Sequence, residues 1–218
     1  MTKPVAREPL RRNARANRER ILATARQELG RNPDTTLEEL ARAAGVVRRT
    51  LFGHFPGREA LLEALAQEAS EALRSALTEV AAFAETEPAE RAFAGFVLSL
   101  WPVGDRYRLL LSLARRDLGA QRVAEVLAPA RATATAILDR GQRAGVFHTH
   151  LPAEAMSAGL EAMTVALLES VNDGLLEDDG TRVAVALLIA AGVPEDRARS
   201  LVGTATATSD AGPGTTDG

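Results

Sequence analysis

Hydrogen-bonding side chains suited to nucleic acid cluster within one short stretch of the chain: Arg48, Arg49, Thr50 and His54. An arginine guanidinium can donate two parallel hydrogen bonds to the edge of a guanine, and it can also pair with a phosphate. Two core helices joined by an incidental turn would not explain so many polar groups in a row. The stretch therefore indicates a surface that meets the major groove of a DNA duplex.

A pair of short helices is expected to hold these side chains. The segment 34–39 contains two overlapping capping boxes, each a Thr followed three residues later by a Glu, so a helix begins here. Gly45 can adopt the positive φ that a tight turn requires, and a second short helix is expected over 47–53. Apolar residues suited to the inner side of this pair stand at Leu40, Ala41, Val46 and Leu51. The spacing is that of a helix-turn-helix motif.

Longer helices are expected on either side of the motif. Apolar residues recur at helical spacing over 14–29, and Pro56-Gly57 ends the second short helix before a long amphipathic helix begins at Arg58. We therefore expect residues 15–60 to form a three-helix DNA-binding domain. Residues 1–14, which are basic and lack periodicity, are expected to form a flexible arm.

The charge distribution agrees with a phosphate-binding end. The whole chain has a net charge of only −3, but residues 1–60 hold 13 Lys+Arg against 7 Asp+Glu, and the remaining residues hold 13 against 22. A basic quarter joined to an acidic remainder is typical of a protein with one end on nucleic acid. On charge alone, a solvated surface of mixed sign explains the asymmetry equally well.

A longer run of residues around the motif carries a family resemblance. The matching residues are Arg20-Ile21-Leu22, Leu37 to Ala41, Ala44-Gly45-Val46, Thr50-Leu51-Phe52, His54-Phe55 and Arg58 to Leu62. Over about residues 15–65 they resemble the DNA-binding domain of the tetracycline-repressor (TetR) family. The resemblance implies an all-helical dimer that binds DNA under the control of a small molecule.

The resemblance also implies roles for individual residues. Phosphate contacts would be made from the helix starts and the end of the reading helix, by Thr36, His54 and Arg58. Base contacts in the major groove would be made by Arg48, Arg49 and Thr50.

The motif departs from the family pattern at three further DNA-facing positions. Phe52 stands where the family usually has Tyr, so one phosphate hydrogen bond is lost, although its ring can still touch a thymine methyl group. Val47 replaces the usual Ser or Thr at the start of the second short helix, which removes a cap worth about 1 kcal/mol. Gly53 offers no side chain where the family often has a bulky or basic one.

The rest of the chain, residues 61–202, is expected to form a larger helical domain for ligand binding and dimerisation. Helices are predicted from Pro88 to Trp101, from Asp105 to Arg116 after a break at Pro102, from Ala120 to Arg143 with a kink or break at Pro129, and in a last short element after Pro194. The Gly/Thr/Ala/Asp-rich residues 203–218 are expected to be a disordered tail.

Two further predicted helices, 153–172 and 179–191, are apolar on nearly all sides. A helix of this kind must be covered all round, and a second subunit can supply the cover. The resemblance implies a four-helix dimer interface built from this pair; burial inside a single subunit is the alternative. Dimerisation would place two reading helices about one helical turn apart, on an inverted-repeat operator.

Candidate ligand-lining residues in the regulatory domain are large apolar side chains, because small-molecule pockets are mostly apolar with a few polar groups. They are Phe93, Phe96, Trp101, Tyr107, Leu110 and Met163. The effector is expected to be a small apolar molecule. A role in the plain hydrophobic core is the alternative for each residue.

Several functional classes are disfavoured. The chain has no cysteine, which excludes disulfides, thiolate nucleophiles and cysteine-ligated metals. His148 and His150 form an HxH pair that could bind a metal, but without a third ligand a solvated loop is favoured. We expect no cofactor, no metal and no catalytic residues, because no glycine-rich phosphate loop or catalytic triad is present. No membrane span is expected, and a cytoplasmic location is predicted.

The sequence thus predicts an all-α, ligand-responsive transcription regulator, most often a repressor in function, that a small effector releases from DNA. Two other interpretations stay open at this stage. One is a constitutive, architectural DNA-binding dimer without an effector. The other is a helical interaction module whose helix-turn-helix contacts protein.

Overall fold

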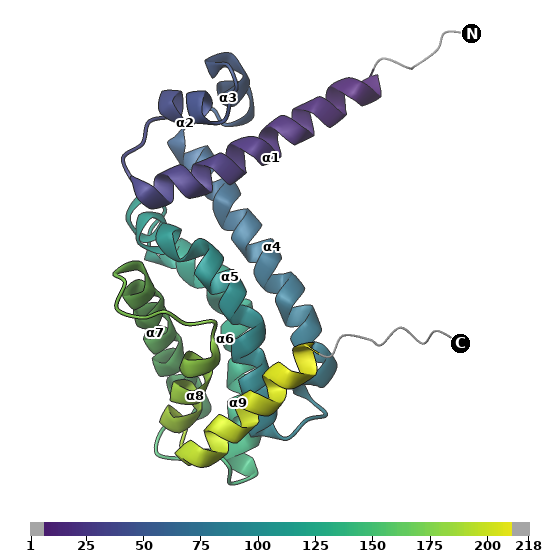
Figure 1. Cartoon of the computed structure of the whole chain (residues 1–218), viewed down its shortest axis with the longest axis vertical. Helices are drawn as coiled ribbons and strands as arrows, with labels where there is room; N and C mark the ends of the chain where they lie inside the picture. The colour runs from purple at the N-terminus through teal and green to yellow at the C-terminus, as the bar shows by residue number, and fades with distance from the viewer. Residues whose placement is uncertain (1–6, 211–218) are drawn as a thin grey trace, which may run out of the picture. The chain divides into compact units, whose positions relative to one another are not determined.

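The computed structural model describes residues 7–210. All secondary-structure elements in that part of the chain are α-helices, joined by loops and turns (Figure 1). Their bounds are α1 Arg7–Arg31, α2 Leu37–Ala43, α3 Arg48–His54, α4 Arg58–Ala84, α5 Ala89–Asp117, α6 Ala120–Arg143, α7 Ala153–Asn172, α8 Thr181–Ala190 and α9 Glu195–Asp210. The predicted all-α fold is confirmed. No helix in the described part of the chain is long and apolar enough to cross a membrane.

The chain divides into two compact units. Unit 1 comprises the residues up to Ala69 together with Leu109–Val126, and unit 2 comprises Ser70–Arg108 and the residues from Leu127 onward. The helix-turn-helix lies in unit 1, as the sequence predicts. Unit 1 nevertheless contains more than the predicted domain 15–60, since the first part of α4, the end of α5 and the start of α6 belong to it.

The core of unit 1 forms where α1, α2 and α3 pack against one another (Figure 1). The largest fully buried side chains come from each of these helices and from the segments that follow α3: Ile21, Leu29, Leu40, Leu51, Phe55 and Leu61. Their helical spacing places one apolar stripe of each helix inwards and leaves the other face to solvent. This packing fixes the two short helices, which would not be stable alone.

Helix α1 begins at Arg7, earlier than the predicted start near residue 14. Within this extension Arg12 and Asn13 are exposed, so tertiary burial does not explain their helical conformation. Alanine and arginine are strong helix formers, and the ion pair of 3.0 Å between Arg15 and Glu19 adds an i,i+4 contact on this face. The first six residues of the predicted arm lie outside the described part of the chain.

The predicted break at Pro102 is wrong, because α5 runs through it without interruption. A proline inside a helix costs about 3 kcal/mol, mainly through a lost hydrogen bond and a clash with the preceding turn. The neighbouring Trp101 is only 4% exposed, and its Nε1 donates to the carbonyl of Asp178 at 3.2 Å. Burying a tryptophan is worth about 3–5 kcal/mol, which offsets the cost.

The core of unit 2 gathers around the middle of α5. Phe93 stacks on Phe96 at 6.0 Å between ring centroids and meets the edge of Phe147 at 5.9 Å. Trp101 lies against Gly180, whose positive φ of 103° and missing Cβ allow the approach; a Cβ there would lie 2.8 Å from the indole. Pro129 is likewise accommodated inside a single helix, α6.

Two predicted helices of unit 2 are confirmed at α7 and α8, and the last one is longer than predicted. Helix α9 runs from Glu195 to Asp210, so the first residues of the predicted tail are helical. Ala198 and Val202 are buried on its inner side, and the hydroxyl groups of Thr204 and Thr206 donate to carbonyls one turn back, which satisfies them within the helix. The rest of the predicted tail, residues 211–218, lies outside the described part of the chain.

Candidate nucleic-acid interface

The turn between α2 and α3 has the geometry that the sequence predicts. Gly45 has φ 63°, and its N–H donates to the carbonyl of Arg42 at 3.1 Å, while the next N–H, of Val46, donates to Ala41 at 2.9 Å. A Cβ at Gly45 would meet nothing within 4 Å, so the glycine is required by the backbone conformation and not by lack of space. The turn fixes the angle at which α3 leaves α2.

Thr36 caps α2 in a reciprocal box with Glu39. The hydroxyl of Thr36 accepts from the N–H of Glu39 at 3.2 Å, and the Glu39 carboxylate accepts from the Thr36 N–H at 2.8 Å. Hydrogen bonds from the Thr36 backbone and hydroxyl lower the pKa of Glu39. Of the two capping boxes that the sequence allows, the structure has the second.

Arg48, the first residue of α3, has two neighbours within unit 1. Its Nη2 donates to Oε1 of Glu38 on α2 at 2.9 Å, and its guanidinium lies 5.0 Å from the ring centroid of Phe52 one turn further on. The Arg48 side chain is still 69% exposed. The phenyl ring at position 52, which lacks the hydroxyl group usual in the family, thus supports a guanidinium next to the surface.

Apart from Arg58, the other residues predicted to contact DNA lie on α3 or at its N-cap, and they are exposed or half-buried. Val47, Arg49 and Gly53 are exposed, while Thr50 and His54 are half-buried. Val47 makes no side-chain hydrogen bond as N-cap, as predicted, and its isopropyl group is 70% exposed. A Cβ at Gly53 would meet nothing within 4 Å. The three predicted base-reading side chains therefore share one short helix, whose inner face is anchored by the buried Leu51.

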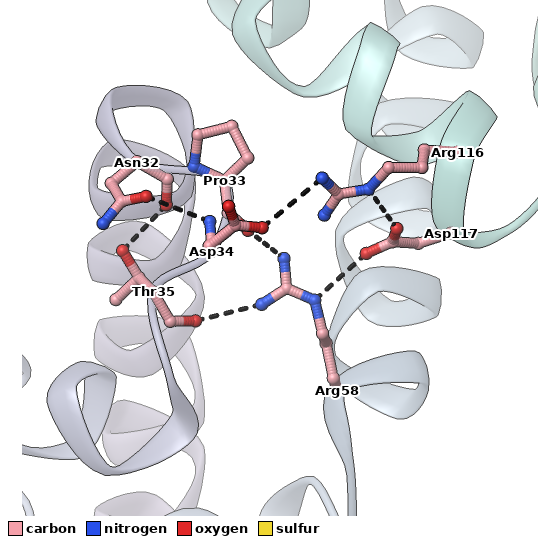
Figure 2. A network of polar contacts seen from close by, with 7 residues as sticks. All are labelled: Asn32, Pro33, Asp34, Thr35, Arg58, Arg116 and Asp117. Carbon is pink, nitrogen blue, oxygen red and sulfur yellow. Dashed lines mark hydrogen bonds and ion pairs between the residues drawn. The ribbon is translucent and has the colours of Figure 1, made fainter.

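Arg58, the other predicted phosphate contact, is held within unit 1 by three protein groups (Figure 2). Its Nε donates to Oδ2 of Asp117 at 3.0 Å, its Nη1 donates to the carbonyl of Thr35 at 3.0 Å, and its Nη2 donates to the carbonyl of Pro33. Sequence reasoning missed Asp117, because 59 residues separate it from Arg58 and no local pattern joins them.

Two more ion pairs tie the elements of unit 1 together. Arg122 at the start of α6 makes a two-pronged contact with Glu63 on α4, and this contact lowers the pKa of Glu63. Arg26 on α1 lies 2.5 Å from a carboxylate oxygen of Glu68, further along α4. Helix α4 is thereby bound on two sides by arginines from other helices.

The predicted ligand-lining residues lie in well-packed surroundings. Phe93, Phe96, Trp101 and Tyr107 on α5 are buried in unit 2, Met163 on α7 is half-buried there, and Leu110 is buried in unit 1. Of this set the structure brings the rings of Phe93 and Phe96 into contact, and it assigns Leu110 to the other unit.

The HxH pair lies in the loop between α6 and α7. The rings of His148 and His150 are 5.3 Å apart, and Nε2 of His148 is 3.2 Å from the carbonyl of Ala190. Among the described residues, no group of three or more His, Asp or Glu side chains has the proximity needed to hold a metal ion.

The comparison with protein families identifies the reading domain. Residues 21–65 match the family described as bacterial regulatory proteins, tetR family. The predicted resemblance of the helix-turn-helix segment to this family is confirmed. A comparison with curated protein sequences gave no match.

Solved structures share the fold over most of the chain. A γ-butyrolactone receptor, described as an ArpA-like protein, is 19% identical with a TM-score of 0.68 and covers 91% of this chain and 98% of its own. PfmR, a TetR-family transcriptional regulator from Thermus thermophilus, is 18% identical with a TM-score of 0.66 and covers 79% and 97%. RolR in complex with resorcinol is 22% identical with a TM-score of 0.55 and covers 88% and 95%.

Proposed function

We propose that this chain is a ligand-responsive transcriptional repressor that binds an inverted-repeat operator as a homodimer and is released by a small, largely apolar effector. The observation that carries the proposal is the exposed polar side of α3, with Arg48, Arg49 and Thr50 on a helix anchored by a fully buried Leu51. Guanidinium groups on a rigid, exposed helix meet the geometric needs of base reading in the major groove.

The phosphate contacts of the proposal are made at the edges of this helix pair. At the start of α2, the exposed Thr36 would exchange the hydrogen bond from its hydroxyl to the Glu39 carboxylate for one to a phosphate. His54 at the end of α3 lies beside the ring of Phe55, at 6.2 Å between centroids, where its imidazole can reach the DNA backbone. Contact with phosphates sets the register of the domain, and contact with bases sets the sequence.

The dimer interface of the proposal is formed by α7 and α8. Small residues stand exposed along α7 at Ala155, Ala158, Gly159, Ala162 and Ala166, and Ile189 on α8 is 42% exposed. A row of small side chains allows two helices to approach closely, and an exposed apolar face of this kind favours a partner. A second copy of the chain would bring the same face by symmetry.

The effector of the proposal binds near the aromatic side chains on α5. Two of the structural relatives are described with small organic ligands: RolR with resorcinol, and the γ-butyrolactone receptor. Buried aromatic side chains with one polar group each, Trp101 and Tyr107, suit a small apolar ligand that carries a polar group. Ligand binding there would displace α4 and change the spacing of the two reading helices.

The test begins with selection of bound duplexes from a random pool, followed by affinity measurements on the enriched sequence. Arg49→Ala should weaken specific binding by about 1–3 kcal/mol, as expected for loss of a base contact. Arg143→Ala, an exposed arginine in unit 2, is the matched control and should have little effect. Equal effects of both variants, or no enriched sequence, would argue for the protein-interaction alternative.

Release by effector is tested separately on the same duplex with resorcinol and γ-butyrolactone as first probes. A shift of the binding curve to higher protein concentration supports the ligand-responsive proposal. Specific DNA binding that no member of a wider small-molecule set changes would favour the constitutive architectural dimer.

A further inference from the structure

Three segments of unit 1 that are distant in sequence meet around one guanidinium group. Arg58 is the first residue of α4, Asp117 is the last residue of α5, and residues 32–35 form the loop that leads from α1 into α2. Figure 2 shows the Arg58 side chain between this loop and Asp117, and the neighbouring Arg116 reaching Asp34 of the loop. We call Arg58, Asp117, Arg116, Asp34 and the carbonyl groups of residues 33 and 35 the Arg58 cluster.

Each side of the Arg58 guanidinium has a protein acceptor. Nε faces the carboxylate of Asp117, and the two terminal nitrogens face the carbonyls of Thr35 and Pro33. The side chain is only 30% exposed. These contacts use three of the five N–H groups of the guanidinium, so a phosphate could bind only through the remaining N–H groups of a side chain that the loop and Asp117 already hold.

The Asp117 carboxylate is fully engaged as well. Oδ2 accepts from Arg58, and Oδ1 accepts from Nε of Arg116 at 2.6 Å; these hydrogen bonds lower the pKa of Asp117, with the Arg116 bond contributing most. Arg116 in turn reaches Oδ1 of Asp34 at 3.4 Å. The end of α5 therefore contacts the loop twice, directly through Arg116 and indirectly through Arg58.

The loop that these groups hold leads straight into the α2 N-terminus. Its own turn is fixed by Asn32, whose carbonyl accepts from both the N–H and the hydroxyl of Thr35, at 3.1 and 2.8 Å. Thr35 is buried, and the next residue is Thr36, the N-cap of α2. A displacement of the Thr35 carbonyl would move the N-cap and, with it, the first turn of the helix-turn-helix.

We infer that Asp117 is a positioning residue for DNA binding: through Arg58 and Arg116 it holds the 32–35 loop and thereby the orientation of α2, the first helix of the helix-turn-helix. Arg58 then acts as the link and not as a phosphate ligand, in contrast to the role that the family resemblance implies. This inference rests on the proposed function. It assigns to the DNA-binding domain a residue that lies outside residues 21–65.

The direction in which one substitution changes the affinity for DNA distinguishes this inference from a simple effect of net charge. Asp117→Asn removes a negative charge from unit 1, and by charge alone it should strengthen binding to DNA. If Asp117 positions the loop, the variant should instead bind the selected duplex about tenfold more weakly, within the usual range of energetic coupling between sites. Glu63→Gln is the matched control, since it removes the charge of another Arg-paired carboxylate in unit 1 without touching the loop.

The salt dependence of binding tests the role of Arg58. A direct phosphate contact adds about one counterion to the slope of log Kd against log salt concentration, so its loss reduces the slope by about 1. If Arg58 is a positioning residue, Arg58→Gln should weaken DNA binding by a factor similar to that of Asp117→Asn. The slope of log Kd against log salt concentration should then stay unchanged. The two substitutions should combine less than additively, because both remove the ion pair between Arg58 and Asp117.

Amide hydrogen exchange on the free protein keeps the test independent of DNA. In Asp117→Asn, the amides of residues 34–40 should exchange faster, while those in the α1 core stay protected as in the wild type. Wild-type affinity and exchange in Asp117→Asn, or tighter binding, would overturn the inference while the proposed function stands. Absence of any specific duplex for the wild-type protein would overturn the proposed function itself.

Discussion

Arg48 and Glu38 form an ion pair across the helix-turn-helix, with Nη2 of Arg48 2.9 Å from Oε1 of Glu38. The two residues come from different helices, and the guanidinium also lies over the ring of Phe52. An exposed ion pair contributes little to stability, but it reduces the number of orientations that a long side chain samples. Glu38 and Phe52 thus hold Arg48 in a limited set of directions before any DNA is bound.

Glu38→Gln should therefore reduce discrimination more than affinity. The variant removes a negative charge from the DNA-facing side, so binding to non-specific duplex should become tighter or stay the same. The ratio of specific to non-specific affinity should fall by about threefold to tenfold, a fraction of what one bidentate base contact provides. Titration of both duplexes at one salt concentration measures this ratio.

Glu28→Gln is a suitable control, because Glu28 pairs with Arg31 on α1 and not with a predicted base-reading residue. An unchanged ratio for both variants would show that Arg48 needs no orientation by Glu38.

Replacing each of two glycines of the helix-turn-helix by alanine should change the free energy of unfolding in opposite directions. Gly45 has φ 63°, so Gly45→Ala should lower the free energy of unfolding by about 1 kcal/mol through backbone strain alone. Gly53 lies inside α3 with open space around its Cα, so Gly53→Ala should raise the free energy of unfolding by about 0.5–1 kcal/mol. Denaturant titration of both variants provides the measurement; the same sign for both would contradict the described turn.

Gly45 and Arg58 show which features of the helix-turn-helix domain can be predicted from the sequence and which cannot. The turn at Gly45, the cap at Thr36 and the buried Leu51 follow from local patterns, and each is found where the patterns predict. The environment of Arg58 depends on Asp117, which only the fold of α5 brings near. Local propensity also fails at Pro102, where burial of the adjacent Trp101 keeps α5 continuous.

The Arg58 cluster predicts a specific dependence of stability on pH. Hydrogen bonds from Arg116 and Arg58 hold the folded-state pKa of Asp117 below its usual 3.8. Because the folded pKa is lowered, the carboxylate stabilises the fold at pH values above 3.8 and loses this effect as the pH falls through the lowered value. Wild type should thus exceed Asp117→Asn in unfolding free energy by a constant amount above about pH 5, and by less toward about pH 3.

Denaturant titrations of the two proteins at several pH values measure this difference. A difference that stays constant down to about pH 3 would mean that Asp117 titrates identically in the folded and unfolded states.

If the exposed face of α7 forms the proposed dimer interface, one charged side chain placed on that face should disrupt the dimer. Ala162 is exposed, so Ala162→Glu should leave the folded subunit intact while placing a carboxylate in the proposed dimer interface. Sedimentation should show a monomer, and affinity for the selected duplex should fall by at least about 100-fold, since half of the contacts are lost. Ala81→Glu, at an exposed position on α4, is the control. A dimer that survives Ala162→Glu would place the interface elsewhere.

The central claim is that α3 reads DNA as one half of a symmetric pair. The most direct measurement is selection of bound sequences from a random duplex pool by the full-length protein, followed by footprinting of the enriched sequence. The account predicts an inverted repeat whose half-sites lie about one helical turn apart, or a multiple of that, with protected bases in the major groove at each centre. Enrichment of a single, asymmetric site, or of no sequence at physiological salt, would contradict it.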